Sequence, residues 1–213
     1  MQRLWRHLLV TAGVAVGVAW PMERAAAQQY LGSLTYNLGI PTGDTQDFTD
    51  NESWLGLTFE GQWLVRPNVS AGFLLGWNEF YHRTDTTLPL ENGAISGGQY
   101  RHLNIFPILV GGKYYINGGA TVGAKVAPYA GLSAGTYYVR QLFDIGTVEF
   151  TDTGWLFGVA PEVGVLFPLG VGSGSVAVLN ARYNLPFSSG SFLGDESQSF
   201  QYWTISVGVG FGL

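Results

Sequence analysis

The chain has 213 residues, of which 15% are aromatic and only 12% are charged, about half the charged share of soluble domains. It contains no cysteine, which excludes disulfides, thiolate metal sites, cysteine nucleophiles and a lipoprotein anchor. The formal net charge of -5, with no basic patch, opposes nucleic-acid binding. So few charges indicate that much of the surface faces something other than water.

The first residues have the layout of a secretory signal peptide. Two arginines in MQRLWRH precede the apolar run LLVTAGVAVGVAW, and small residues follow at Ala25 and Ala27. The alternative is a membrane-anchoring helix, but the run is shorter than the ~20 residues that a bilayer requires. The sequence therefore predicts a signal peptide over 1–27, cleaved after Ala27, and one domain over 28–213.

From residue 28 onward, large apolar residues alternate with small or polar ones, which is the period of a β-strand. The segment WTISVGVGFGL, at 203–213, shows this alternation most strictly, and no segment shows a persuasive helical period. Eight strands are predicted, over 29–39, 53–65, 69–81, 100–116, 125–140, 153–167, 174–186 and 199–213. Pro107, Pro128 and Pro161 fall inside strands and should each mark a bulge or a local irregularity, because proline cannot donate to a ladder.

The predicted connections alternate in length. Three are short, over 66–68, 117–124 and 168–174, and four are long and polar, over 40–52, 82–99, 141–152 and 187–198. An even number of antiparallel strands with tight turns at one end and long loops at the other predicts an all-β, eight-stranded antiparallel up-and-down transmembrane β-barrel. A soluble barrel or sandwich is the alternative.

The bulky apolar face is expected to point outward, toward lipid. Eight strands enclose a narrow interior, which a lining of glycine and small polar residues fits better than large residues do. The small-residue face also carries too few charges to coat a soluble protein. Aromatic residues at both ends resemble two interfacial girdles; they are Trp77, Trp155 and Trp203 toward the long loops, and Trp63, Tyr114 and Phe167 toward the short turns.

Four charged residues lie deep within strands on the small-residue face: Glu60, Lys113, Glu162 and Arg182. Buried charges persist only when they are paired, and two acids balance two bases. We therefore expect a lumenal charge cluster, with Asn180 and Tyr115 completing its hydrogen bonding. One interpretation is an ion network that fills the core, and the other is a gate for protons or small ions.

The signal sequence, the alternating strands, the short turns and the long acidic loops together resemble the small bacterial outer-membrane β-barrel proteins of the OmpA/OmpX/OmpW-like group. The segments FPILVGGKYYI, VAPYAGLSAGTYY, FGVAPEVGVLFPL and VLNARYN look like recurring strands of that family. The resemblance implies a bacterial outer-membrane location, a last strand that closes the barrel against the first, and recognition of that strand by the barrel-insertion machinery. Such a strand usually ends in an aromatic residue, whereas this one ends in Leu213, with Phe211 two residues earlier.

The sequence is compatible with three functions. The first is a non-enzymatic integral outer-membrane protein without cofactors, with a structural, adhesive or minor permeability role and a side-chain-plugged lumen. Its partners would be outer-membrane lipid and an extracellular ligand or cation at the acidic loop 44–52, although such charge runs usually only keep a loop soluble. The second is a lipid-modifying enzyme, for which His82 and His102 are available, but no serine follows His102 at strand-face spacing. The third is a soluble lipocalin-like ligand carrier.

Overall fold

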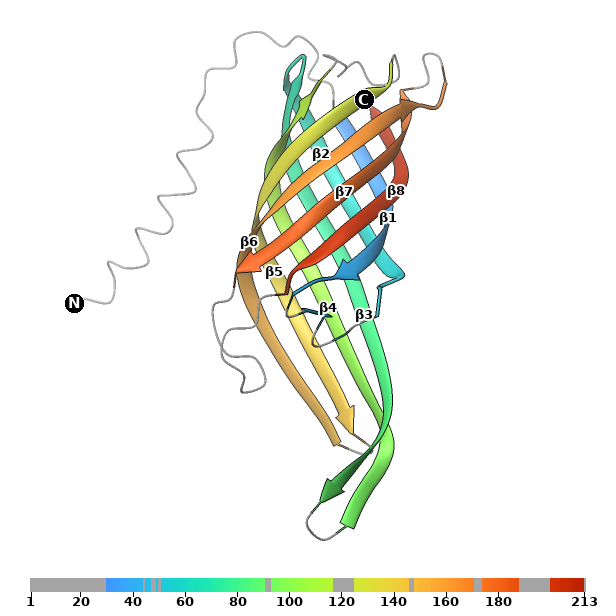
Figure 1. Ribbon diagram of the computed structural model, residues 1–213. Helices are drawn as coiled ribbons and strands as arrows, with labels where there is room; N and C mark the ends of the chain where they lie inside the picture. Colours follow the sequence, from blue (N-terminus) through green and yellow to red (C-terminus); the bar gives the residue numbers. More distant parts are fainter. Residues whose placement is uncertain are drawn as a thin grey trace, which may run out of the picture.

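The chain forms a single closed antiparallel barrel in which consecutive strands pair and β8 pairs with β1 (Figure 1). The computed structural model describes residues 30–43, 45–46, 49, 51–90, 93–116, 125–145, 148–170, 174–187 and 200–212. The strands are β1 (Tyr30–Pro41), β2 (Leu55–Arg66), β3 (Val69–Leu90), β4 (Gly93–Tyr115), β5 (Ala127–Ile145), β6 (Val148–Pro168), β7 (Ser175–Phe187) and β8 (Tyr202–Gly212). The predicted all-β, eight-stranded fold is confirmed, whereas the predicted signal peptide lies outside the described residues.

Closure depends on the ladder between β1 and β8. It runs from Leu31 opposite Gly212 to Pro41 opposite Tyr202 without a shift of register. The strict alternation of β8 fixes this register. A shift by one residue would turn all of its apolar side chains from the outer face of the sheet to the inner face. Each strand of the barrel wall therefore has a hydrogen-bonded neighbour on both sides.

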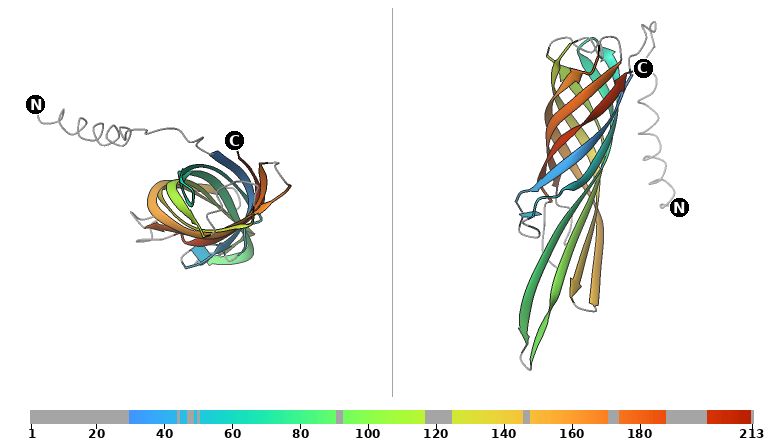
Figure 2. Two further views of the ribbon diagram at one scale, coloured as in Figure 1. Left: turned by 90° about the horizontal axis from the view of Figure 1, so that it is seen from above. Right: turned by 90° about the vertical axis from the view of Figure 1, so that its right-hand side faces the viewer.

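Two of the predicted long loops are mostly strand. β3 and β4 continue as one hairpin to Leu90 and Gly93, and β5 and β6 continue to Ile145 and Val148. Figures 1 and 2 show the first hairpin, in green, projecting far beyond the barrel and the second projecting less far. The prediction of loops over 82–99 and 141–152 is wrong because backbone pairing in an exposed hairpin needs no apolar face, and its threonines favour extended conformations.

The three strand prolines do not shift the register. Pairs on both sides of Pro107, Pro128 and Pro161 keep one register, so the expected bulges are absent at these positions. The ladder does lose pairs beside Pro107 toward β3 and beside Pro161 toward β7, as expected for a residue without an N–H group. The register shifts instead between Leu64 and Arg66, next to the turn that joins β2 and β3.

The two faces of the sheet differ as the alternation predicts. Val163 and Val207 are 59% and 58% exposed on the outside, whereas Glu60 and Arg182 are 3% and 2% exposed within the barrel. Large apolar side chains are exposed on all eight strands, among them Leu34, Phe59, Leu75, Val110, Leu132, Phe157, Leu179 and Ile205. Among the described residues, no helix is long and apolar enough to cross a membrane.

Gly208 lets β8 approach β1 closely. A methyl group at this inward-facing position would collide with the backbone carbonyl oxygen of Leu34, whereas one at Gly210 would first meet the side chains of Val176 and Leu31, at 3.0 and 3.1 Å. Side chains can move aside, but a paired backbone cannot. We therefore expect Gly208→Ala to destabilise the barrel by roughly 1–3 kcal/mol, the usual range for overpacking.

Urea unfolding of the refolded barrel in detergent, followed by tryptophan fluorescence, measures this loss. Gly210→Ala is the matched control, on the same strand and the same face, and should lose less. Equal losses in the two variants would contradict the close approach at Gly208.

Candidate functional site

The structure brings the four deep charges together in the middle of the barrel. Lys113 Nζ lies 2.9 Å from Glu162 Oε1 and also pairs with Glu60. Arg182 Nη2 lies 2.8 Å from Glu162 Oε2 and also pairs with Glu60 Oε1. Each cation therefore contacts both carboxylates. We call Glu60, Lys113, Glu162 and Arg182 the ion quartet.

The ion quartet is almost completely buried, since its most exposed member, Lys113, is only 7% exposed. Its formal charges cancel, and Arg182 Nε adds a further bond of 3.1 Å to Glu162 Oε2. Lys113 Nζ also lies 4.6 Å from the centroid of the Tyr129 ring, within cation–π range. The quartet takes one residue from each of β2, β4, β6 and β7. Its ion pairs therefore connect strands that are far apart in the sequence. Whether it serves stability or gating stays a prediction.

Asn180 and Tyr115 do not complete the hydrogen bonding of the ion quartet. The Tyr115 hydroxyl lies 3.4 Å from Ser70 Oγ, and the amide of Asn180 finds no hydrogen-bond partner within the described part of the chain. Other polar side chains line the wall near the quartet instead. Asn184 Nδ2 donates to Thr204 Oγ1 at 2.8 Å, and Asn37 Nδ2 donates to Thr58 Oγ1 at 2.7 Å.

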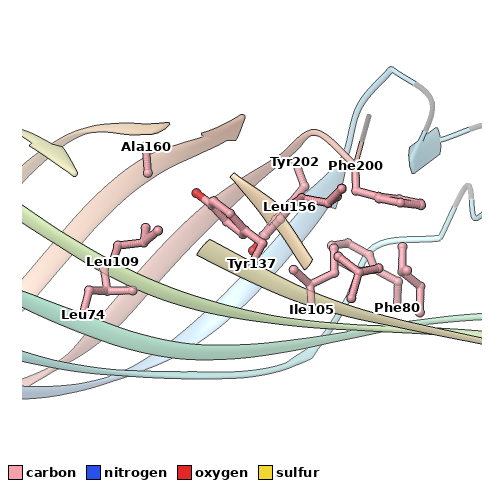
Figure 3. Close-up of a cluster of buried hydrophobic side chains, with 11 residues drawn as sticks. Leu74, Phe80, Ile105, Leu109, Tyr137, Leu156, Ala160, Phe200 and Tyr202 are labelled. Carbon is pink, nitrogen blue, oxygen red and sulfur yellow. The ribbon is translucent and has the colours of Figure 1, made fainter. Parts of the chain in front are cut away.

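Large apolar side chains fill the interior on both sides of the ion quartet. The layer toward the long hairpins, which we call the upper layer although the hairpins point downward in Figure 1, is shown in Figure 3. It contains Leu74, Phe80, Leu103, Ile105, Leu109, Tyr137, Val139, Leu156, Ala160, Phe200 and Tyr202. The lower layer, toward the short turns, contains Leu31, Tyr115, Ala127, Tyr129, Leu166, Val176 and Val178. The expectation of an interior lined only by glycine and small polar residues is therefore wrong.

The sequence carried a signal for these layers that the alternation argument missed. In β4, large apolar residues occupy both faces, with Leu103, Ile105 and Leu109 inside and Ile108 and Val110 outside. This strand packs its inward apolar side chains into the core and exposes its outward ones on the barrel surface. Gly135 on the neighbouring strand β5 leaves room for one of them, since a Cβ there would lie 3.2 Å from Leu109 Cδ2.

A second group of interacting polar side chains lies on the outer wall. His102 Nδ1 of β4 is 3.0 Å from Glu79 Oε1 of β3, and both side chains are partly exposed. The Trp77 indole donates to Asn104 Oδ1 at 3.0 Å, and the Tyr81 ring packs on the His102 ring with centroids 4.8 Å apart. We call Glu79, His102 and Asn104 the outer-wall triplet. Two members of a hydrolytic triad are present in it, but an asparagine occupies the next outward position after the histidine.

The other candidate residues form no comparable site. His82 Nδ1 lies 3.3 Å from the Asn51 amide near the barrel mouth. Asp44, Asp47 and Asp50 of the acidic loop fall outside the described residues. Among those described, no group of three or more histidine, aspartate or glutamate side chains could hold a metal ion.

The predicted girdle residues all lie in strands of the barrel wall. Trp155 and Trp203 are exposed and Trp77 is half-buried at the long-hairpin end, while Trp63, Tyr114 and Phe167 are exposed toward the short turns. Further aromatic rings lie beside the girdle residues at the long-hairpin end. The ring centroids of Phe106 and Tyr138 are 6.0 Å apart, those of Tyr138 and Trp155 are 5.1 Å apart, and those of Tyr183 and Trp203 are 4.8 Å apart.

No protein-family model and no curated protein matches the chain. Among solved structures, it is similar to outer membrane protein OprG from Pseudomonas aeruginosa, with 16% identity, 88% of this chain and 96% of that chain covered, and a TM-score of 0.49. It is also similar to Neisserial surface protein A, with 12% identity, 89% and 99% coverage and a TM-score of 0.48. Ail, the attachment invasion locus protein of Yersinia pestis, matches with 12% identity, 86% and 99% coverage and a TM-score of 0.48.

The closed barrel and its coating define the class of this protein. Eight strands pair without an edge in the barrel wall, and apolar side chains are exposed on all of them. Such a wall is suited to hydrocarbon, where every backbone polar group needs a partner within the protein. The protein is therefore a closed eight-stranded antiparallel β-barrel of the transmembrane type.

The ion quartet predicts an unusual order of stability among variants. Arg182→Met leaves Glu60 and Glu162 buried opposite Lys113 alone, and we expect it to lose about 3–5 kcal/mol, the range for breaking a buried ion pair. The double variant Glu162→Gln/Arg182→Met restores neutrality, so it should be more stable than Arg182→Met.

Urea unfolding in detergent measures both variants against wild type. Arg66→Met, at an exposed arginine near a turn, is the control and should change stability by less than about 0.5 kcal/mol. If the double variant were as unstable as the sum of its single variants, the pairing of Arg182 with Glu162 would carry no net energy.

Proposed function

We propose that this protein is an integral outer-membrane barrel that anchors an extracellular hairpin sheet and has a plugged lumen, with a structural or adhesive role. It would be exported through a cleaved signal peptide over 1–27 and inserted by the barrel-insertion machinery. Its location, its export and its insertion are supported by the fold class and by the layout of the first residues. One observation carries the plug: apolar layers lie above and below the ion quartet.

The filled interior supports a structural role over general permeability. An eight-stranded barrel is only wide enough for side chains to fill it. Here a water-soluble solute would have to displace Phe80 and Tyr202 at the mouth, the ion quartet in the middle and Tyr129 below. A minor conductance of protons or small ions is the weaker alternative within this proposal.

The long hairpins support an adhesive role. β3 and β4 continue together beyond the last β2–β3 pair, Leu55 opposite Glu79, up to Leu90 and Gly93. In barrels of this class the longer connections face the outside of the cell. The projecting hairpins would therefore present a surface to extracellular partners while the barrel holds them in place.

The lipid-modifying enzyme is the second candidate, because His102 and Glu79 form a base–carboxylate pair on the outer wall. Acyl transfer also needs a nucleophile within hydrogen-bond reach of the base. The neighbouring outward position carries Asn104, whose side-chain oxygen accepts a bond from Trp77. The soluble carrier is opposed by the apolar residues exposed on all eight strands, for which water is a poor solvent.

Planar-bilayer recording tests the plug. We expect a small wild-type conductance that Lys113→Ala and Arg182→Ala leave unchanged, because the apolar layers remain above and below. Combining Lys113→Ala with Tyr137→Ala removes parts of two neighbouring layers and should raise the conductance. A clear rise in either single variant would contradict the plug and favour the gate, and heat-modifiable gel mobility verifies that each variant is folded.

Mass spectrometry of lipid A tests the enzyme. Membranes from cells that express the protein should show the same acyl pattern as membranes from cells that express the Glu79→Gln/His102→Gln variant. An acyl change that appears with the wild type and disappears with the variant would establish catalysis at this pair.

A further inference from the structure

The outward side chains of β3 and β4 change in character along the barrel wall. Leu75 and Ile108 are exposed and apolar in the region expected to face hydrocarbon. Above them comes the aromatic level, made by Trp77, Phe106, Tyr138 and Trp155. Aromatic residues of this kind occupy the boundary between hydrocarbon and headgroups. The next outward residues along the strands are therefore expected at the depth of the lipid headgroups.

Those next residues are polar and lie side by side. Glu79 is opposite Asn104, and Asn104 is opposite Arg140 of β5, so one row crosses three strands. His102 belongs to the next row up, where it is opposite Tyr81. At the same level the neighbouring strand β2 carries Leu55. The charged groups are thus gathered on the β3–β5 side of the barrel.

Several hydrogen-bonding groups in these two rows are available to a ligand. Arg140 is exposed and has no ionic partner within the described ranges. Asn104 uses its oxygen for Trp77, which leaves its Nδ2 donor free to face outward. Nδ1 of His102 lies 3.0 Å from the Glu79 carboxylate, a contact that favours the tautomer protonated on Nδ1 and leaves Nε2 to face a ligand.

We propose that Arg140 and the outer-wall triplet bind the phosphorylated sugar headgroup of an outer-leaflet glycolipid. The Arg140 guanidinium and the Asn104 amide donate to phosphate oxygens, which are strong acceptors for arginine. The His102 Nε2 accepts from a sugar hydroxyl, and the Tyr81 ring offers an aromatic face beside it. This inference rests on the proposed embedding of the barrel, with its long hairpins outside the cell.

A phosphorylated glycolipid fits this patch better than an ordinary phospholipid does. A phospholipid headgroup would engage Arg140 but would leave the Glu79–His102 pair without a role, because it lacks a sugar ring at that depth. The position next to His102 is occupied by an amide rather than a nucleophile, so the ligand is held and not cleaved. Glu79 fixes the imidazole of His102, which makes it a positioning residue for the ligand contact.

Native mass spectrometry of the refolded protein in detergent, titrated with diphosphorylated lipid A, tests this inference. Arg140→Gln and His102→Gln should each weaken binding by about tenfold, the effect of losing one hydrogen bond to the ligand. Arg66→Gln is the matched control, since it removes an exposed arginine at the opposite end of the barrel. Its binding should stay within about twofold of wild type, because it lies outside the site.

The probe lipids separate the sources of affinity. Dephosphorylated lipid A should bind more weakly than the diphosphorylated form, and so should phosphatidylglycerol, which has the phosphate but no sugar. Equal binding of phosphatidylglycerol, or an equal loss in Arg66→Gln, would mean simple attraction between charges and would overturn the site. Release of a fatty acid from lipid A would overturn it too. Heat-modifiable mobility verifies the barrel independently, so a folded barrel without selective binding overturns only this inference.

Discussion

The pairing of β1 with β8 is the constraint on which the rest of the structure depends. It gives the last strand of the barrel wall a partner and removes the edge that an open sheet would present to lipid. Once the sheet is closed, each residue of the wall points either into a narrow interior or out toward the surroundings. The alternation in β8 assigns Val207 and Val209 to the outside and Ser206 and Gly208 to the inside.

A closed barrel of this size must fill its narrow interior with side chains, and any charges buried there must be neutralised. In the ion quartet the charges are neutralised, because each cation contacts both carboxylates and the formal charges cancel. The apolar layers fill the remaining volume. Tyr137 on the long-hairpin side of the quartet and Tyr129 on the short-turn side occupy space that would otherwise admit water. Removing a quartet residue therefore disturbs stability more readily than it opens a path.

The strand period was sufficient to predict the number of strands, their inward and outward faces, and the four charges that meet in the lumen. It could not predict the apolar layers. Leu103 and Ile105 lie on a strand with large apolar residues on both faces, so the sequence does not show which face points inward. It also missed the long hairpins, since backbone pairing through Leu90 and Gly93 leaves no apolar pattern. The pairing of Glu79 with His102 depends on the register between β3 and β4, which a single strand does not specify.

The assignment of sides is the central claim, and paramagnetic relaxation in lipid tests it directly. In methyl-labelled protein embedded in bilayers, a nitroxide on the lipid acyl chain should broaden the methyl signals of Val163 and Val207, which face outward. The methyl signals of Val139 and Val178, which lie inside the barrel, should keep their intensity. Equal broadening of the two groups, or stronger broadening of Val139 and Val178, would contradict a barrel whose apolar coat faces the membrane.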